Sequence, residues 1–222
     1  MSSQETVPGV TVRPFQARDR DAVRRISYET ADGGKPGDSI SPDRDFIADL
    51  LTAYYTDFEP ESAFVAVAGG EVAGYLTGCL DTRREIKVLF ARVIPRAFAR
   101  GFLAGALFRA DTWRLVWSAL KAALACGASR GVDLALFPAH LHVNILEGFR
   151  GMKIGPRLME AFERAAKAAG APGIHLSVRE DNAAARRFFE KSGYTLVGRQ
   201  PTILVPRGAA PKLYSVIHAK KL

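Results

Sequence analysis

The passage from residue 132 to residue 170 most constrains the fold, because a strand pattern there gives way to a helix pattern across a glycine-containing turn. Polar and apolar side chains alternate on the two strand faces: His140, His142 and Asn144 on one, Leu141, Val143 and Ile145 on the other. Residues 150–170 then carry apolar side chains at helical spacing, and Gly170 is a typical helix stop. This stretch predicts a strand that leads directly into an amphipathic helix.

The rest of the chain continues this mixture of strand and helix patterns. We predict further strands at residues 10–15, 63–68, 72–80, 173–178, 194–198 and 212–218. We predict further helices at residues 18–29, from a Ser41-Pro42 cap to about residue 55, and at residues 182–192. The order is β-α-α-β-β, an insertion, then β-α-β-α-β-β, which indicates a mixed α/β fold. A length of 222 residues suits one domain, with residues 83–130 as a helical insertion within it.

The positive charge of the chain is concentrated in that insertion. The whole chain has a formal net charge of +8, and residues 83–130 contain ten basic and two acidic residues. The remainder is therefore neutral, whereas a nucleic-acid-binding domain more often spreads positive charge over its framework. No nucleic-acid partner is expected.

The two cysteines, Cys79 and Cys126, suggest neither a disulfide framework nor a metal site. The first nine residues are polar and contain no apolar signal segment. Charged residues interrupt the most apolar stretch, residues 98–127, so no transmembrane segment is expected. We therefore expect a cytoplasmic protein without a metal.

Two stretches carry a family resemblance. Residues 143–155, VNILEGFRGMKIG, combine a strand, a turn and a helix start of the form Arg-x-x-x-x-Gly. Twenty-seven residues after Gly155 begins NAAARRFFEKSGY, residues 182–194. Together and in this order they resemble the two signatures of the GNAT N-acetyltransferase superfamily. The resemblance implies a GNAT fold, in which helices flank a mixed, mostly antiparallel twisted sheet, with the insertion between strands 3 and 4.

The resemblance also implies that acetyl-CoA is the co-substrate. A helix start offers backbone N–H groups and the positive end of a dipole to the diphosphate, and small residues allow close approach. In the family, the preceding strand bonds the pantetheine arm through its backbone, which points here to Asn144, Ile145 and Leu146. The predicted cofactor-binding residues are Ile145, Leu146, Arg150, Gly151, Met152, Lys153, Ile154, Gly155, Asn182 and Phe189. Asn182 could equally be a plain helix cap.

Two positions depart from the family pattern. Lys153 stands where the motif has its middle glycine, so either glycine is not needed there or the lysine adds charge to the phosphate site. Phe189 replaces a tyrosine that often protonates the departing thiolate in the family. Because thiols have a pKa near 8.5, this loss need not abolish catalysis. The alternative is a catalytically degenerate relative that serves as an acyl-CoA-binding sensor or scaffold.

Acetyl transfer needs a neutral amine, whereas a lysine-type amine has a pKa of about 10.4, so a base is expected. His142 is the first candidate and His140 the second, and the competing interpretation is a pair of packed, hydrogen-bonded histidines. Asn144 on the same strand and His175 on the next are candidates to contact the acceptor.

Arg92, Arg96 and Arg100 recur every four residues in the insertion and predict a basic helical stripe. A second helix with an apolar stripe is predicted after Asp111. Both helices could pack on the domain with a solvated basic face. Alternatively, Arg96 and Arg100 bind an anionic substrate or the cofactor, or the segment contacts a membrane or nucleic acid.

The sequence thus predicts direct transfer of an acetyl group from acetyl-CoA to a primary amine of a small molecule or protein. Neither signature contains a cysteine, so no covalent enzyme intermediate is expected. A backbone N–H near Ile145 or Leu146 would hold the oxyanion. Sequence alone leaves open the acceptor, the acyl chain length and the choice between a monomer and a homodimer.

Overall fold

In the described part of the chain, seven strands form one sheet in the order β1-β2-β3-β4-β5-β7-β6. The computed structural model describes residues 9–41, 43–103, 105, 108–110, 112–114, 116–117, 131–202, 205–208 and 213–222. The strands are β1 (Val10–Pro14), β2 (Ala63–Ala68), β3 (Glu71–Cys79), β4 (Ala139–Ile145), β5 (Gly173–Arg179), β6 (Thr195–Pro201) and β7 (Tyr214–Lys221). The pairing of β4 with β5 is parallel and the other described pairings are antiparallel. The predicted mixed, mostly antiparallel sheet is confirmed.

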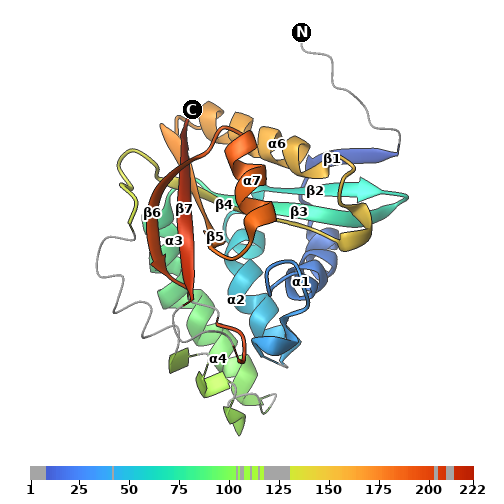
Figure 1. The fold of residues 1–222 in the computed structure, drawn as a ribbon. Helices are drawn as coiled ribbons and strands as arrows, with labels where there is room; N and C mark the ends of the chain where they lie inside the picture. The colour runs from blue at the N-terminus through green and yellow to red at the C-terminus, as the bar shows by residue number, and fades with distance from the viewer. Residues whose placement is uncertain are drawn as a thin grey trace.

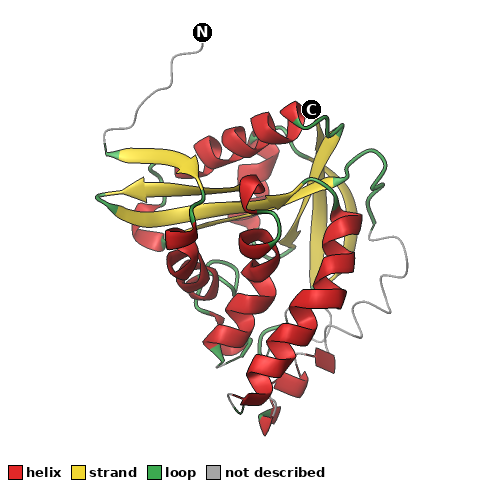
Figure 2. Ribbon diagram, turned by 180° about the vertical axis from the view of Figure 1, so that it is seen from behind, coloured by secondary structure: helices red, strands yellow, loops and turns green. Residues whose placement is uncertain are grey.

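Helices lie against both faces of this sheet, as Figures 1 and 2 show. They are α1 (Arg20–Glu29), α2 (Arg44–Asp57), α3 (Thr82–Val88), α4 (Ile94–Leu103), α6 (Ile154–Ala168) and α7 (Ala183–Lys191). Short 3-10 turns lie at Ala17–Asp19, Gly37–Ser39, Pro60–Ser62 and Glu147–Phe149. The predicted element order is confirmed.

The largest apolar core lies between the sheet and α6. Leu158 and Phe162 of α6 are fully buried there with Leu76 of β3 and Leu141 of β4. Gly78 lets the helix come this close, because a Cβ at that position would lie 2.2 Å from the Phe162 ring. On the other face, α1 and α2 cover the strands, and Val23 and Ile26 pack on Val65 and Tyr75.

Two predicted helix starts were wrong. Helix α2 is capped by Asp43, whose carboxylate accepts a hydrogen bond of 2.9 Å from the Phe46 N–H, instead of by the predicted Ser41-Pro42 pair. Pro42 itself lies outside the described residues. Helix α6 begins at Ile154 and not at Arg150, because the chain turns through left-handed backbone angles at Gly151 and Lys153.

The helical insertion between β3 and β4 is confirmed, but its first helix is longer than a simple stripe suggests. Helix α3, a π-helical turn at Leu89–Val93 and α4 follow one another without a break from Thr82 to Leu103. Asp81 caps this run by accepting from the N–H groups of Arg83 and Arg84. The predicted second helix falls partly outside the described residues. Asp111, Leu120 and Leu124 are among those that lie outside.

Candidate functional site

Strands β4 and β5 diverge soon after they meet. They pair at Ala139 with Ile174 and at His140 with His175, and the ladder ends there although both strands continue for several residues. Figure 1 shows the consequence, since β1–β3 and β6–β7 run in clearly different directions. The later part of β4 therefore has one backbone edge without a strand partner in the described sheet.

The register of β4 identifies which backbone groups face that edge. The Leu146 N–H donates a 3.0 Å hydrogen bond to the Ala73 carbonyl across the β3 side. Because backbone groups alternate direction along a strand, those of Val143 and Ile145 face the β5 side. The Leu146 N–H is thus already bonded within the sheet, whereas the Ile145 N–H faces the side of β4 that has no strand partner.

The start of α6 follows β4 through a turn with two positive-φ residues, Gly151 and Lys153. Lys153 is the N-cap with φ 53°, and among the described residues it is the one non-glycine with a positive φ. Gly151 has φ 83°, and nothing lies within 4 Å of where its Cβ would be. Successive N–H groups in such mixed left- and right-handed backbone form an anion-binding nest. Glycine suits the middle position of the motif because the backbone there is left-handed. Lys153 adopts this conformation at a cost of about 1–2 kcal/mol.

The structure gives Gly155 a packing role, in addition to the close approach of phosphate that its motif suggests. A Cβ there would lie 2.9 Å from the ring of Phe188 on α7 and 3.4 Å from Ile145. The missing side chain therefore serves the packing of α6 against α7 and β4. The neighbouring Phe189 is buried in the main core, where its ring contacts Phe188 and Tyr194.

Two other predicted cofactor residues have intramolecular partners. Asn182 caps α7, since its side-chain oxygen accepts a 3.1 Å hydrogen bond from the Ala185 N–H. The Arg150 guanidinium donates at 2.9 Å to the Gly34 carbonyl, in the loop between α1 and α2. That loop is also held by Arg179, which pairs with Asp32. The α1–α2 loop therefore borders the α6 start.

The two strand histidines meet at one tyrosine of α2. The Tyr55 hydroxyl lies 2.8 Å from His140 Nε2 and 3.1 Å from His142 Nε2. His140 is buried, and its Nδ1 lies 2.8 Å from the Thr82 hydroxyl and 3.1 Å from Cys79 Sγ. His142 is solvent-exposed. Only the second histidine can therefore meet a ligand directly.

The charge states around this cluster are settled by its surroundings. Although part of the His142 residue is exposed, desolvation of its ring beside Tyr55, and after it the nearby His175, lower the pKa of His142 from 6.5 to about 4, so the ring is neutral at pH 7. Burial, together with Glu59 and Glu85, strongly raises the pKa of the Cys79 thiol. Cys79 has no solvent-exposed surface and stays a thiol, which does not suit a nucleophile.

The remaining predicted acceptor residues are placed as follows. The Asn144 amide donates at 2.8 Å to the hydroxyl of Tyr75 on β3, beside the open end of β4. His175 is buried, and its Nδ1–H donates at 2.9 Å to the Phe137 carbonyl. Tyr55 and Thr82 were missed by sequence reasoning, because Tyr55 reads as an apolar helix position and no motif connects it with β4.

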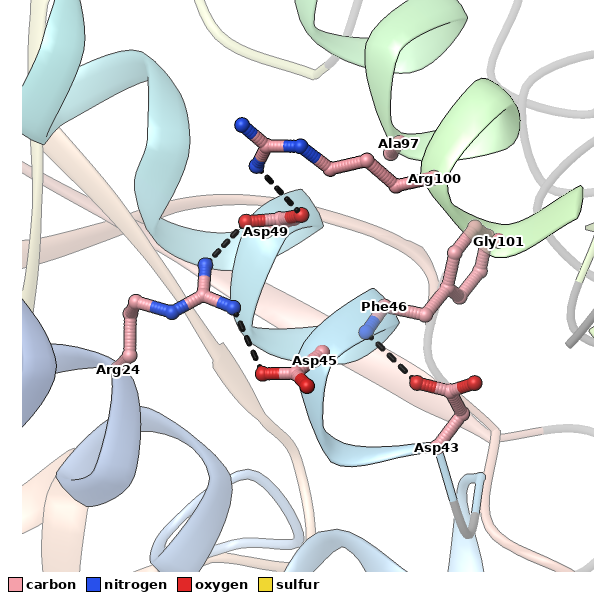
Figure 3. Close-up of a pocket in the computed structure, with 8 residues that line it drawn as sticks. All are labelled: Arg24, Asp43, Asp45, Phe46, Asp49, Ala97, Arg100 and Gly101. Carbon is pink, nitrogen blue, oxygen red and sulfur yellow. Dashed lines mark hydrogen bonds and ion pairs between the residues drawn. The ribbon is translucent and has the colours of Figure 1, made fainter. Parts of the chain in front are cut away.

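The insertion places its basic stripe against α2. Arg92 and Arg96 lie over the Phe58 ring, 5.9 and 5.5 Å from its centroid. Arg100 donates at 3.2 Å to Asp49, which also pairs with Arg24 of α1. Figure 3 shows Asp49 between these two guanidinium groups, in a pocket between α1, α2 and α4. None of the residues lining this pocket belongs to β4 or α6.

Comparison with known proteins shows which family these features resemble. The model of the acetyltransferase (GNAT) family matches residues 123–194, which contain both the α6 start and the Asn182 signature. The crystal structure of SsHAT is similar, with 27% identity, a TM-score of 0.71, and coverage of 96% of this chain and 98% of that chain. Residues 123–194 are therefore similar to the GNAT acetyltransferase family, and the fold of the chain is similar to that of SsHAT.

Two acetyltransferase structures share the fold at lower identity. The structure of yncA from Salmonella typhimurium with its cofactor acetyl-CoA is 15% identical with a TM-score of 0.56, covering 96% of this chain and 94% of that one. The polyamine N-acetyltransferase of Drosophila melanogaster is 16% identical with a TM-score of 0.58, covering 96% of this chain and all of that one. In the described part of the chain, no helix combines the length and apolar character that a membrane span requires.

Proposed function

We propose that this protein transfers an acetyl group directly from acetyl-CoA to a primary amine. One observation carries the proposal: the unpaired edge of β4 leads into the anion-binding start of α6, while the neutral, exposed His142 lies on the same strand. A cofactor-binding edge and a base are thereby brought together within a few residues.

The chain's own groups fit acetyl-CoA. The backbone N–H groups at the α6 start, with the Lys153 ammonium, suit a diphosphate. The Val143 and Ile145 backbone groups suit the amides of the pantetheine arm, and the Ile145 N–H suits a developing oxyanion. Acetyl-CoA supplies the acetyl group as a thioester.

His142 is the base in this proposal. An alkylamine is mostly protonated at pH 7 and must lose one proton to water before its nitrogen can attack. The nitrogen that bonds to the acetyl carbon then gives a second proton to His142, while the C–S bond breaks and CoA leaves as a thiolate. A nitrogen that is forming this bond is more acidic than a free ammonium group, so a weakly basic imidazole that is neutral at pH 7 suffices. His140 is less suitable, because both of its ring nitrogens lie within hydrogen-bonding distance of buried partners.

The test has two stages. Calorimetric titration with acetyl-CoA measures cofactor binding, and a free-thiol assay over primary amines, secondary amines and alcohols then measures transfer. Thiol release with primary amines supports the proposal. Tight binding without release to any acceptor would favour the degenerate acyl-CoA-binding module, for which Phe189 in place of the family tyrosine is the supporting feature. No binding would contradict both functions.

A further inference from the structure

We propose that Tyr55 is a positioning residue which, anchored by His140 and Thr82, holds His142 with its proton on Nε2 and its lone pair on Nδ1. The inference rests on the proposed role of His142 as base, and it specifies which ring nitrogen accepts the proton. It follows from four hydrogen-bond contacts that join β4, α2 and α3.

The assignment starts at Thr82, where the direction of one bond is certain. The Thr82 hydroxyl lies 2.7 Å from the Pro138 carbonyl oxygen, which can only accept, so the single hydroxyl hydrogen is directed there. The same oxygen lies 2.8 Å from His140 Nδ1 and must therefore accept from it. His140 thus carries its proton on Nδ1.

The proton positions then follow one another along the cluster. His140 is buried against the Tyr55, Thr82 and Cys79 side chains, which favours an uncharged ring. With its proton on Nδ1 it has its lone pair on Nε2, so the Tyr55 hydroxyl donates to it at 2.8 Å. The phenol oxygen can then only accept from the second histidine, 3.1 Å away, so His142 is protonated at Nε2. Its lone pair lies on Nδ1, for which no partner is recorded among the described residues.

The reverse arrangement is unfavourable for a specific reason. If His142 Nε2 accepted from Tyr55, His140 would be protonated at Nε2 and would present a lone pair at Nδ1. That lone pair would face the Thr82 oxygen at 2.8 Å with no hydrogen between them. The Cys79 thiol, 3.1 Å from the same nitrogen, is a weak donor and does not remove this repulsion.

The ring packing adds an orientation to this proton order. The Tyr55 ring meets both imidazoles edge to face, at centroid distances of 5.9 Å and 5.6 Å. Tyr55 is itself buried at the end of α2. Both the plane and the tautomer of His142 are therefore determined by groups that a substrate does not contact.

Nitrogen-15 NMR of the histidine rings tests this directly in the full-length protein at pH 7. We expect protonated Nε2 and unprotonated Nδ1 for His142, and the opposite for His140. In the Tyr55→Phe variant, His142 should become a mixture of tautomers. The kcat of this variant should fall about tenfold or more, while its KM for acetyl-CoA should change by less than about twofold. Tyr54→Phe is the matched control, because its hydroxyl bonds to Glu59 instead and its loss should leave the pattern of both histidines unchanged.

A second variant tests the coupling from a distance. Thr82→Val keeps the side-chain shape but removes the acceptor of His140, so the tautomers of both histidines should become mixed. A His142 proton on Nδ1 in the unmodified protein, or an unchanged His142 pattern in both Tyr55→Phe and Thr82→Val, would overturn the proposal. The spectra need no acceptor amine, so they remain decisive even if the protein proves to transfer no acetyl group.

Discussion

At the scale of single residues, the site depends on the contrast between two histidines that share one strand face. His140 is enclosed by Tyr55, Thr82 and Cys79, whereas His142 touches the same tyrosine but remains open to solvent. The two histidines thus differ in exposure because residues of α2 and α3 cover His140 and leave His142 open to solvent.

Replacing His142 tests its role as base. We expect His142→Gln to lower kcat/KM for the amine by about 100-fold or more, because proton removal would then depend on water. The dissociation constant of acetyl-CoA should be unchanged, since the side chain does not lie at the α6 start. A loss below about threefold, measured in the thiol-release assay, would assign the proton to another group.

The lowered pKa of His142 also predicts how stability depends on pH. Between about pH 6.5 and pH 4 the unfolded chain binds a proton at this position and the folded protein does not. The contribution of the neutral ring is therefore complete above pH 6.5 and is lost as the pH falls toward 4. Urea unfolding at pH 7 and pH 5 should show a larger loss of stability for the unmodified protein than for His142→Gln. Equal losses would show that the pKa is not lowered.

At the scale of elements, the junction of β4 and α6 joins an open strand edge to a helix start. Lys153 takes left-handed backbone angles at the start of α6, and the close packing of Gly155 against Phe188 holds α7 beside this start. A lysine occupies this position, which suits glycine, and its charge lies at the start of α6.

Reversing that charge should weaken cofactor binding. We expect Lys153→Glu to raise the dissociation constant of acetyl-CoA about tenfold or more, since one charge-assisted contact contributes about 1.5–3 kcal/mol. Lys167→Glu is the matched control, because it makes the same change in the last turn of the same helix. Calorimetry at low and high salt should show the effect of Lys153→Glu shrinking as salt rises. Equal effects of both variants would indicate only the net charge of the protein.

Helix α6 packs closely on β3, where Phe162 lies against Gly78. We expect Gly78→Ala to lower the free energy of unfolding by about 1–3 kcal/mol, because three atoms of the fully buried Phe162 ring lie within 2.8 Å of the new methyl group. Phe162→Leu in the same chain should recover part of this loss by making room. Additive losses in the double variant, measured by urea unfolding, would contradict the packing explanation.

At the scale of the whole molecule, the insertion is fastened to α2 by its arginines. Arg100 shares Asp49 with Arg24, and Arg92 and Arg96 lie over Phe58 (Figure 3 shows the first of these contacts). This arrangement favours a packing role for the basic stripe over direct contact with a ligand. Exposed aromatic side chains, including Phe102 and Trp117, lie farther along the same segment.

Neutralising the stripe distinguishes these roles. Changing Arg92, Arg96 and Arg100 together to glutamine should lower the free energy of unfolding by about 1–2 kcal/mol, through the loss of two ring contacts and one partly exposed ion pair. The control changes Arg83, Arg84 and Lys87 to glutamine on the same helical run and should stay within about 0.5 kcal/mol. Unchanged stability, with acetyl-CoA or amine affinity lost more at low salt, would instead assign the stripe to an anionic ligand.

Local patterns in the chain were enough to predict the element order and the two faces of β4, because periodicity reports directly on which side of an element is buried. The cofactor motif came from the resemblance of two stretches to a known family, and its binding role stays a prediction. Local patterns could not reveal that β4 and β5 separate after His140, since that depends on how two halves of a twisted sheet diverge. Nor could they join Tyr55 to His142, 87 positions away, or Arg100 to Asp49. Those contacts arise only when helices pack on the sheet, and the resulting burial, rather than residue type, decides which histidine can act.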